Sequence, residues 1–82
     1  VEDIASGQAE RVFCAVRPPG HHAGPTGGEG FCLFNNVAIG ALKAQQLGFN
    51  RIAVIDFDRH HGNGTQDILN GREGVLFVSS YQ

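Results

Sequence analysis

Three short apolar runs divide the chain, at residues 11–16, 51–56 and 75–79. The run RIAVID is the clearest, because its continuous β-branched residues are typical of a strand that is buried on both faces. The runs RVFCAV and VLFVS have the same character. These patterns predict three buried strands.

Helical spacing of apolar positions separates the predicted strands. A helix is expected from a cap at Asn35 or Asn36 to Leu47, a shorter helix at 65–70, and the end of another at 1–6. A glycine follows each of them, and glycine commonly ends helices. The order strand, helix, strand, helix, strand predicts right-handed crossovers in a parallel sheet, which is an α/β fold without internal repeats or linkers.

All four histidines lie in the two loops that leave the carboxyl ends of predicted strands. His21 and His22 belong to the Pro- and Gly-rich segment 17–30, and His60 and His61 follow the second strand. Sites in parallel sheets form outside these strand ends. A single histidine is usually structural, but two doublets at one sheet edge predict a functional site.

The segment after the second strand has metal-ligand spacing. If the strand continues in an extended conformation, the alternate residues Asp56, Asp58 and His60 lie on one face of it, and His61 points to the other face. Asp58 and His60 would then offer a carboxylate oxygen and an imidazole nitrogen, each about 2.0–2.2 Å from one Zn²⁺. An Asp-x-His triplet also occurs at helix caps and surface turns. Carboxylates at the end of a buried strand, however, favour a compensating cation.

A binuclear metal site is the alternative use of this triplet. A binuclear manganese site of the arginase type needs a further carboxylate two residues after His60, where this chain has Gly62. A single-ion site is therefore favoured. A catalytic zinc site normally has three protein ligands and an open position, and no third ligand is well placed in this sequence.

Composition excludes several classes of function. The net charge is −2 and the six basic residues are scattered, so no positive field would attract nucleic acid or an anionic membrane. No apolar run approaches the roughly 18–20 residues of a membrane helix, and no signal peptide opens the chain. The glycine-rich stretch 24–30 lacks the spacing of a nucleotide-binding loop.

Cys14 and Cys32 have no paired spacing, which indicates reduced thiols and a cytoplasmic protein. A nucleophilic Cys32 would leave the acidic and histidine residues at 56–60 unexplained.

Four stretches together resemble the histone deacetylase family, in its class II and bacterial acetylpolyamine-amidohydrolase branch. They are RPPGHHA at 17–23, GFCLFNNVAIGA at 30–41, IDFDRHHGNGTQ at 55–66 and VLFVSSYQ at 75–82. The resemblance implies an arginase/deacetylase α/β fold, of which residues 1–82 would be a central βαβαβ portion within a single domain. Because family members are several times longer, the chain is expected to be an interior fragment.

The resemblance also implies roles for individual residues. Asp58 and His60 would be two of the zinc ligands, and His22 would act as general base and acid. His21 would be the electrostatic partner oriented by Asp56, and Asn63 would hold His22. A structural potassium ion would bind the backbone oxygens of Asp56, Asp58 and His60, the Ser79 hydroxyl and the Ser80 carbonyl.

The implied substrate is an acetylated lysine side chain or an acetylated polyamine. Phe31 would form one wall of a narrow tunnel for its chain, with Gly30 at the base. Arg59 stands where the family usually has Val or Leu, and Tyr81 is not where the family places its catalytic tyrosine. The third zinc-binding Asp and the catalytic Tyr or His would follow Gln82.

The resulting prediction is a zinc-dependent amidohydrolase that removes acetyl groups, with no nucleic-acid or membrane partner. The isolated 82-residue chain is expected to be inactive. The alternative is a truncated or degenerate non-catalytic relative, or a metal-binding module without turnover. A cytoplasmic location is expected, with the nucleus as a further location in a eukaryote.

Overall fold

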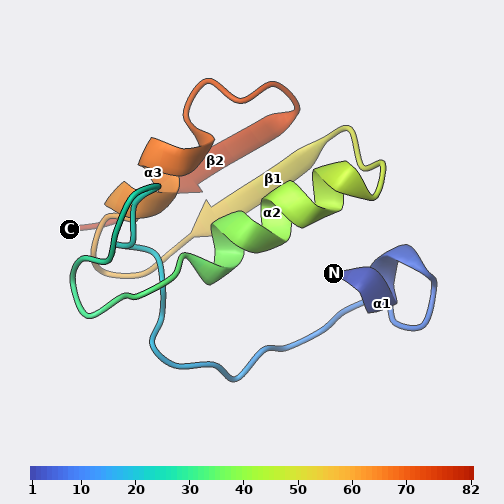
Figure 1. Cartoon of the computed structure of the whole chain (residues 1–82), viewed down its shortest axis with the longest axis horizontal. Helices are drawn as coiled ribbons and strands as arrows, with labels where there is room; N and C mark the ends of the chain where they lie inside the picture. The colour runs from blue at the N-terminus through green and yellow to red at the C-terminus, as the bar shows by residue number, and fades with distance from the viewer.

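A two-stranded parallel sheet with helices on one side forms the centre of the structure, a computed structural model that describes all 82 residues (Figure 1). The elements in chain order are α1 (Glu2–Ala5), α2 (Asn36–Gln46), β1 (Ile52–Asp56), α3 (Asn63–Leu69) and β2 (Val75–Ser79). The strands pair in parallel, from Ile52 opposite Val75 to Asp56 opposite Ser79. α3 is the crossover between them, as the βα alternation predicted. None of the helices has the length and apolar character needed to cross a bilayer.

The core is small and lies between the helices and one face of the sheet. It is centred on Ala38 and Ala41 of α2, Val54 of β1 and Leu69 of α3. Only 11 of 82 residues are buried, and Ile55 and Leu76 on the other sheet face are 69% and 61% exposed. The prediction that the strands are buried on both faces is therefore wrong for this chain, because both packed helices cover the same face.

The first predicted strand, residues 11–16, does not form. These residues are exposed and run as irregular chain away from the sheet, along the lower edge of Figure 1. Their only backbone hydrogen bond joins the Val16 N–H to the Cys14 carbonyl. A strand is stable only when a neighbouring strand pairs with its backbone groups, and neither β1 nor β2 does so here. The expected βαβαβ unit is thus a βαβ unit in this chain, within the same α/β class.

Local capping explains where the helices begin and end. α2 starts after Asn35, whose side chain accepts a hydrogen bond from the Ala38 N–H at 3.0 Å. It closes at Gly48, which has a φ of +99°. α3 begins at Asn63, two residues before the expected start, because the N–H groups of Gly64 and Thr65 both donate to the His21 carbonyl. This earlier start places Asn63 in the first helical turn.

Replacing Gly40 with alanine should stabilise the protein. Gly40 lies within α2, and an added Cβ would meet only a Val1 methyl group, at an ordinary 3.6 Å. Alanine favours the helix over glycine by about 0.5–1 kcal/mol, so the free energy of unfolding should rise by about that amount in chemical denaturation. Gly48→Ala is the control, since its positive φ predicts destabilisation. A loss of stability in Gly40→Ala would show that this helix face is not open.

Candidate active site

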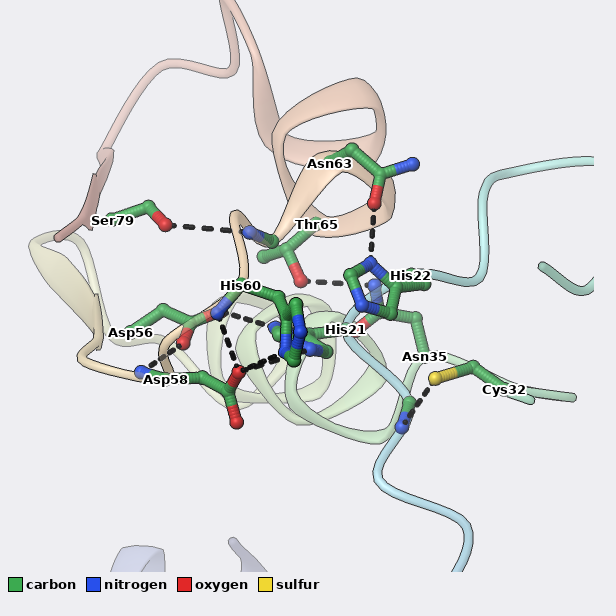
Figure 2. A network of polar contacts seen from close by, with 12 residues as sticks. His21, His22, Cys32, Asn35, Asp56, Asp58, His60, Asn63, Thr65 and Ser79 are labelled. Atoms are coloured by element: carbon green, nitrogen blue, oxygen red, sulfur yellow. Dashed lines mark hydrogen bonds and ion pairs between the residues drawn. The ribbon is translucent and has the colours of Figure 1, made fainter. Parts of the chain in front are cut away.

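Three of the four histidines gather beyond the carboxyl ends of β1 and β2. The Pro- and Gly-rich segment returns past this edge and brings His21 and His22 to the loop that follows β1 (Figures 1 and 2). The ring centroids of His21 and His22 are 4.1 Å apart, and those of His22 and His60 are 6.1 Å apart. His61 turns away and lies 4.6 Å from the Tyr81 ring. The sheet edge therefore brings residues from distant segments into one polar cluster.

His21 is held by Asp56, the last residue of β1. Nδ1 of His21 lies 2.8 Å from Oδ2 of Asp56, and both side chains are largely buried. A carboxylate can only accept, so the Nδ1–H donates and Nε2 on the far side of the ring carries no proton when the imidazole is neutral. The other carboxylate oxygen of Asp56 accepts the Asp58 N–H at 3.0 Å. Asp56 thus orients both His21 and the start of the following loop.

His22 has an equivalent partner in Asn63. Nδ1 of His22 lies 2.6 Å from the Asn63 side-chain oxygen, which accepts a hydrogen bond from the ring N–H. Asn63 is fixed in the first turn of α3. His22 therefore also carries its proton on Nδ1 when neutral, and its Nε2 is available to accept one.

Asp58 and His60 meet through a turn, and the expected extended strand is wrong here. β1 ends at Asp56, and residues 58–60 form bends. Oδ1 of Asp58 accepts the His60 N–H at 2.8 Å and lies 3.2 Å from the His60 Nδ1. Such a bond to a backbone N–H two residues ahead is characteristic of Asp in turns. A turn, and not an extended strand, therefore brings the two side chains together.

The Asp58 and His60 donors fit a shared zinc ion. Two ligand atoms at about 2.0–2.1 Å from a tetrahedral metal are about 3.3–3.4 Å apart, close to the observed 3.2 Å between Oδ1 and Nδ1. A carboxylate with an imidazole is also a donor set that zinc accepts. No group of three or more His, Cys, Asp or Glu side chains in the structure is arranged around one point. Asp58 and His60 would therefore supply two of the three protein ligands that a catalytic zinc normally has.

The charge of Asp58 is stabilised by its surroundings. The His60 N–H bonded to its carboxylate lowers the pKa of Asp58, and burial opposes this effect. The side-chain contact with His60 and the charges of His21 and His60 lower the pKa further. Asp58 therefore remains an anion, and an available ligand, at lower pH than an ordinary aspartate.

The oxygens expected to bind potassium lie at the adjoining strand ends. The Asp56 carbonyl accepts the Ser80 N–H at 2.9 Å, and the Ser79 hydroxyl accepts the Gly62 N–H at 3.3 Å. The carbonyls of Asp58, His60 and Ser80 accept no hydrogen bond within the chain. Carbonyl and hydroxyl oxygens are the donors that hard cations prefer, so these residues fit such an ion.

Gly30 and Phe31 form the tip of a tight turn beside His22. Glu29 and Cys32 exchange backbone hydrogen bonds of 3.1 and 2.9 Å, and the φ values of Gly30 and Phe31 are +56° and +65°. Both central residues are left-handed, as in a type I′ turn. A Cβ on Gly30 would lie 2.7 Å from the His22 ring, so only glycine lets the turn pack there. The turn therefore places Gly30 against the His22 ring and leaves Phe31 98% exposed.

Two polar residues behind this cluster were not predicted from the sequence to belong to the site. The local pattern indicates only a possible helix cap at Asn35 and the start of a helix at Thr65. Both are buried, and they bond to each other at 3.0 Å. Their bond joins residues 30 positions apart, which no local signal reveals.

Comparison with known proteins identifies the family. The sequence profile of the histone deacetylase domain matches residues 1–82. The chain is 54% identical over 86 residues to Type-2 histone deacetylase 2 of Dictyostelium discoideum, a match over 96% of this chain and 5% of that protein. It is 51% identical over 77 residues to Acetylpolyamine amidohydrolase 2 of Pseudomonas aeruginosa, a match over 94% of this chain and 22% of that protein.

A solved structure agrees with the fold. The crystal structure of the HDA15 HD domain superposes with a TM-score of 0.93 at 48% identity, over 98% of this chain and 23% of that chain. The class is therefore an α/β domain of the arginase/deacetylase type, in agreement with the sequence prediction. The chain belongs to the histone deacetylase family. It spans only a small part of the length of these relatives.

Proposed function

We propose that the intact protein containing this chain is a zinc-dependent amidohydrolase that removes acetyl groups from lysine side chains or polyamines. The observation that carries this proposal is the pair of histidines with their Nδ1 atoms bound to Asp56 and Asn63. Their Nε2 atoms are therefore free to accept and donate protons beside Asp58 and His60. Family membership supports amide hydrolysis as the reaction, since the relatives are deacetylases and an acetylpolyamine amidohydrolase.

Asp58 and His60 would hold Zn²⁺ together with a ligand from elsewhere in the protein. When bound, Zn²⁺ supplies Lewis acidity to the acetyl carbonyl and to the attacking water. Nε2 of His22 accepts the proton of that water and delivers it to the leaving amine nitrogen, a contribution of about 10²–10⁴-fold. Asp56 keeps His21 oriented and stabilises positive charge on its ring, which balances the negative charge that develops on the substrate.

The substrate proposal follows from the turn at residues 29–32. Phe31 would offer an apolar wall, and Gly30 lets its turn pack directly against the His22 ring. An apolar passage favours a neutral acetylated side chain over the charged amine product. The potassium ion would hold the ends of β1 and β2 through the oxygens of Asp56 and Ser79, behind the zinc ligands.

Metal removal tests the proposal on the intact protein. Hydrolysis of an acetyl-lysine peptide and of an acetylated polyamine should stop after chelation and return when Zn²⁺ is restored. His22→Ala should retain zinc but lose about 10²–10⁴-fold in kcat, because only the proton transfer is removed. Full zinc binding without turnover on either substrate would contradict the proposal and favour a non-catalytic, metal-binding relative.

A further inference from the structure

Asn35 and Thr65 form a buried polar bridge behind the histidine pair. The Asn35 side chain is almost completely buried and Thr65 is fully buried. The amide nitrogen of Asn35 donates to the Ala23 carbonyl at 3.1 Å and to the Thr65 hydroxyl at 3.0 Å. Its oxygen accepts the Ala38 N–H at 3.0 Å. The Asn35 side chain therefore joins three segments (Figure 2). They are the loop at residues 17–30 that carries His21 and His22 (the histidine loop), the start of α2 and the first turn of α3.

The same turn of α3 holds the histidine loop by three further hydrogen bonds. The N–H groups of Gly64 and Thr65 donate to the His21 carbonyl at 3.0 and 3.2 Å. Asn63, two residues before Thr65, accepts the His22 Nδ1–H. Thr65 of the bridge and Asn63, which binds His22, thus lie in one turn of α3. The bridge also bonds to Ala23, which directly follows His22 in the chain.

From this arrangement we infer that Asn35 and Thr65 are positioning residues for His22. They act through the distance between the histidine loop and the first turn of α3, and they touch neither substrate nor metal. The loop at residues 17–30 has no helix or strand of its own, so side-chain and backbone bonds must hold its place. Without the bridge, His22 would lose its close contact with Asn63 and its single proton position. The catalytic consequence rests on the proposed function, whereas the proton position on His22 does not.

Thr65→Val is the main test in the intact protein. Valine has nearly the same shape but lacks the hydroxyl that accepts the Asn35 amide. We expect kcat to fall about 10–100-fold with KM unchanged, because displacements of about 1 Å in a site cost this much. Thr65→Ser should restore the rate, since it keeps the hydroxyl. Thr26→Val is the matched control, because Thr26 is exposed in the same loop and makes no side-chain hydrogen bond.

A mutant cycle with Asn63 separates positioning from general destabilisation. If Thr65 acts through the Asn63–His22 contact, Thr65→Val should lower kcat little further in an Asn63→Ala background. Independent, multiplying effects of the two substitutions would overturn the inference.

The nitrogen-15 shifts of the His22 imidazole give a readout that does not need turnover. The parent protein should show a protonated Nδ1 and an unprotonated Nε2, and Thr65→Val should show a mixture of the two tautomers. His22→Ala assigns the signals. An unchanged His22 spectrum in folded Thr65→Val would overturn the inference. If Thr65→Val does not fold, Asn35→Asp, which keeps the helix cap but loses the amide donor, must show the same tautomer mixture. An inactive parent protein with the expected His22 spectrum would count against the proposed function alone.

Discussion

Gly64→Ala is expected to abolish most of the activity and to destabilise the protein. Gly64 lies in the first turn of α3, where an added Cβ would be 2.2 Å from the Ala23 carbonyl oxygen and 2.6 Å from the His22 carbonyl carbon. Both are backbone atoms, so no side-chain rotation can relieve the overlap. The histidine loop and α3 must move apart, which separates His22 from Asn63. We expect at least about a 100-fold loss of kcat and about 1–3 kcal/mol of stability, as overpacked sites show.

Gly40→Ala is the matched control for this experiment. It makes the same chemical change within a helix, but at a position with open space, and it should stabilise the protein. Chemical denaturation should therefore show opposite changes in stability for the two variants, and turnover should fall in Gly64→Ala alone. A Gly64→Ala protein with normal kcat would show that the loop and α3 are not packed as described.

Asp58→Ala and His60→Ala are each expected to abolish the zinc binding proposed for the intact protein and to reduce its activity to background. Each substitution removes one of the two proposed ligand atoms, Asp58 Oδ1 and His60 Nδ1, which lie 3.2 Å apart just after the end of β1. The loss of activity should exceed the roughly 10–100-fold loss that follows when a residue hydrogen-bonded to a metal ligand is removed and the ligand itself remains. By contrast, Asn63→Ala should retain zinc, because Asn63 bonds to His22 and not to the expected ligands.

Elemental analysis of the dialysed proteins measures this prediction directly. Asp67→Ala is the control, because Asp67 is an exposed aspartate of α3 and makes no hydrogen bond or ion pair through its side chain. It should keep the zinc content of the parent protein. Zinc retention by both Asp58→Ala and His60→Ala would place the metal elsewhere and contradict the assignment of ligands.

Features encoded over a few residues were predictable from the sequence. The apolar runs of β1 and β2 and the glycine after α2 lie where the pattern predicted them, because strand preference and helix termination depend on neighbouring residues. The contact between Asp58 and His60 spans only two positions, so it survives although the backbone there is a turn. The start of α3 was misplaced because its first N–H groups bond to His21, far away in the chain.

Contacts between distant segments depended on the tertiary structure. Residues 11–16 have the composition of a strand, but pairing with a neighbour decides whether a strand forms, and no neighbour pairs with them here. The His21–Asp56 contact joins residues 35 positions apart, and only the resemblance to a family implied it. The Asn35–Thr65 bridge was not implied at all.

The sequence by itself therefore determined the α/β class and the family, and it predicted the residues that we propose to carry the chemistry. These follow from local preferences and from motifs that are readable in order along the chain. The tertiary structure alone decided which imidazole nitrogen is bound, which sheet face is covered and which buried groups hold the histidine loop. The polar contacts join residues 30 or more positions apart, and the packing of α2 and α3 against the sheet determines how the loops between them close.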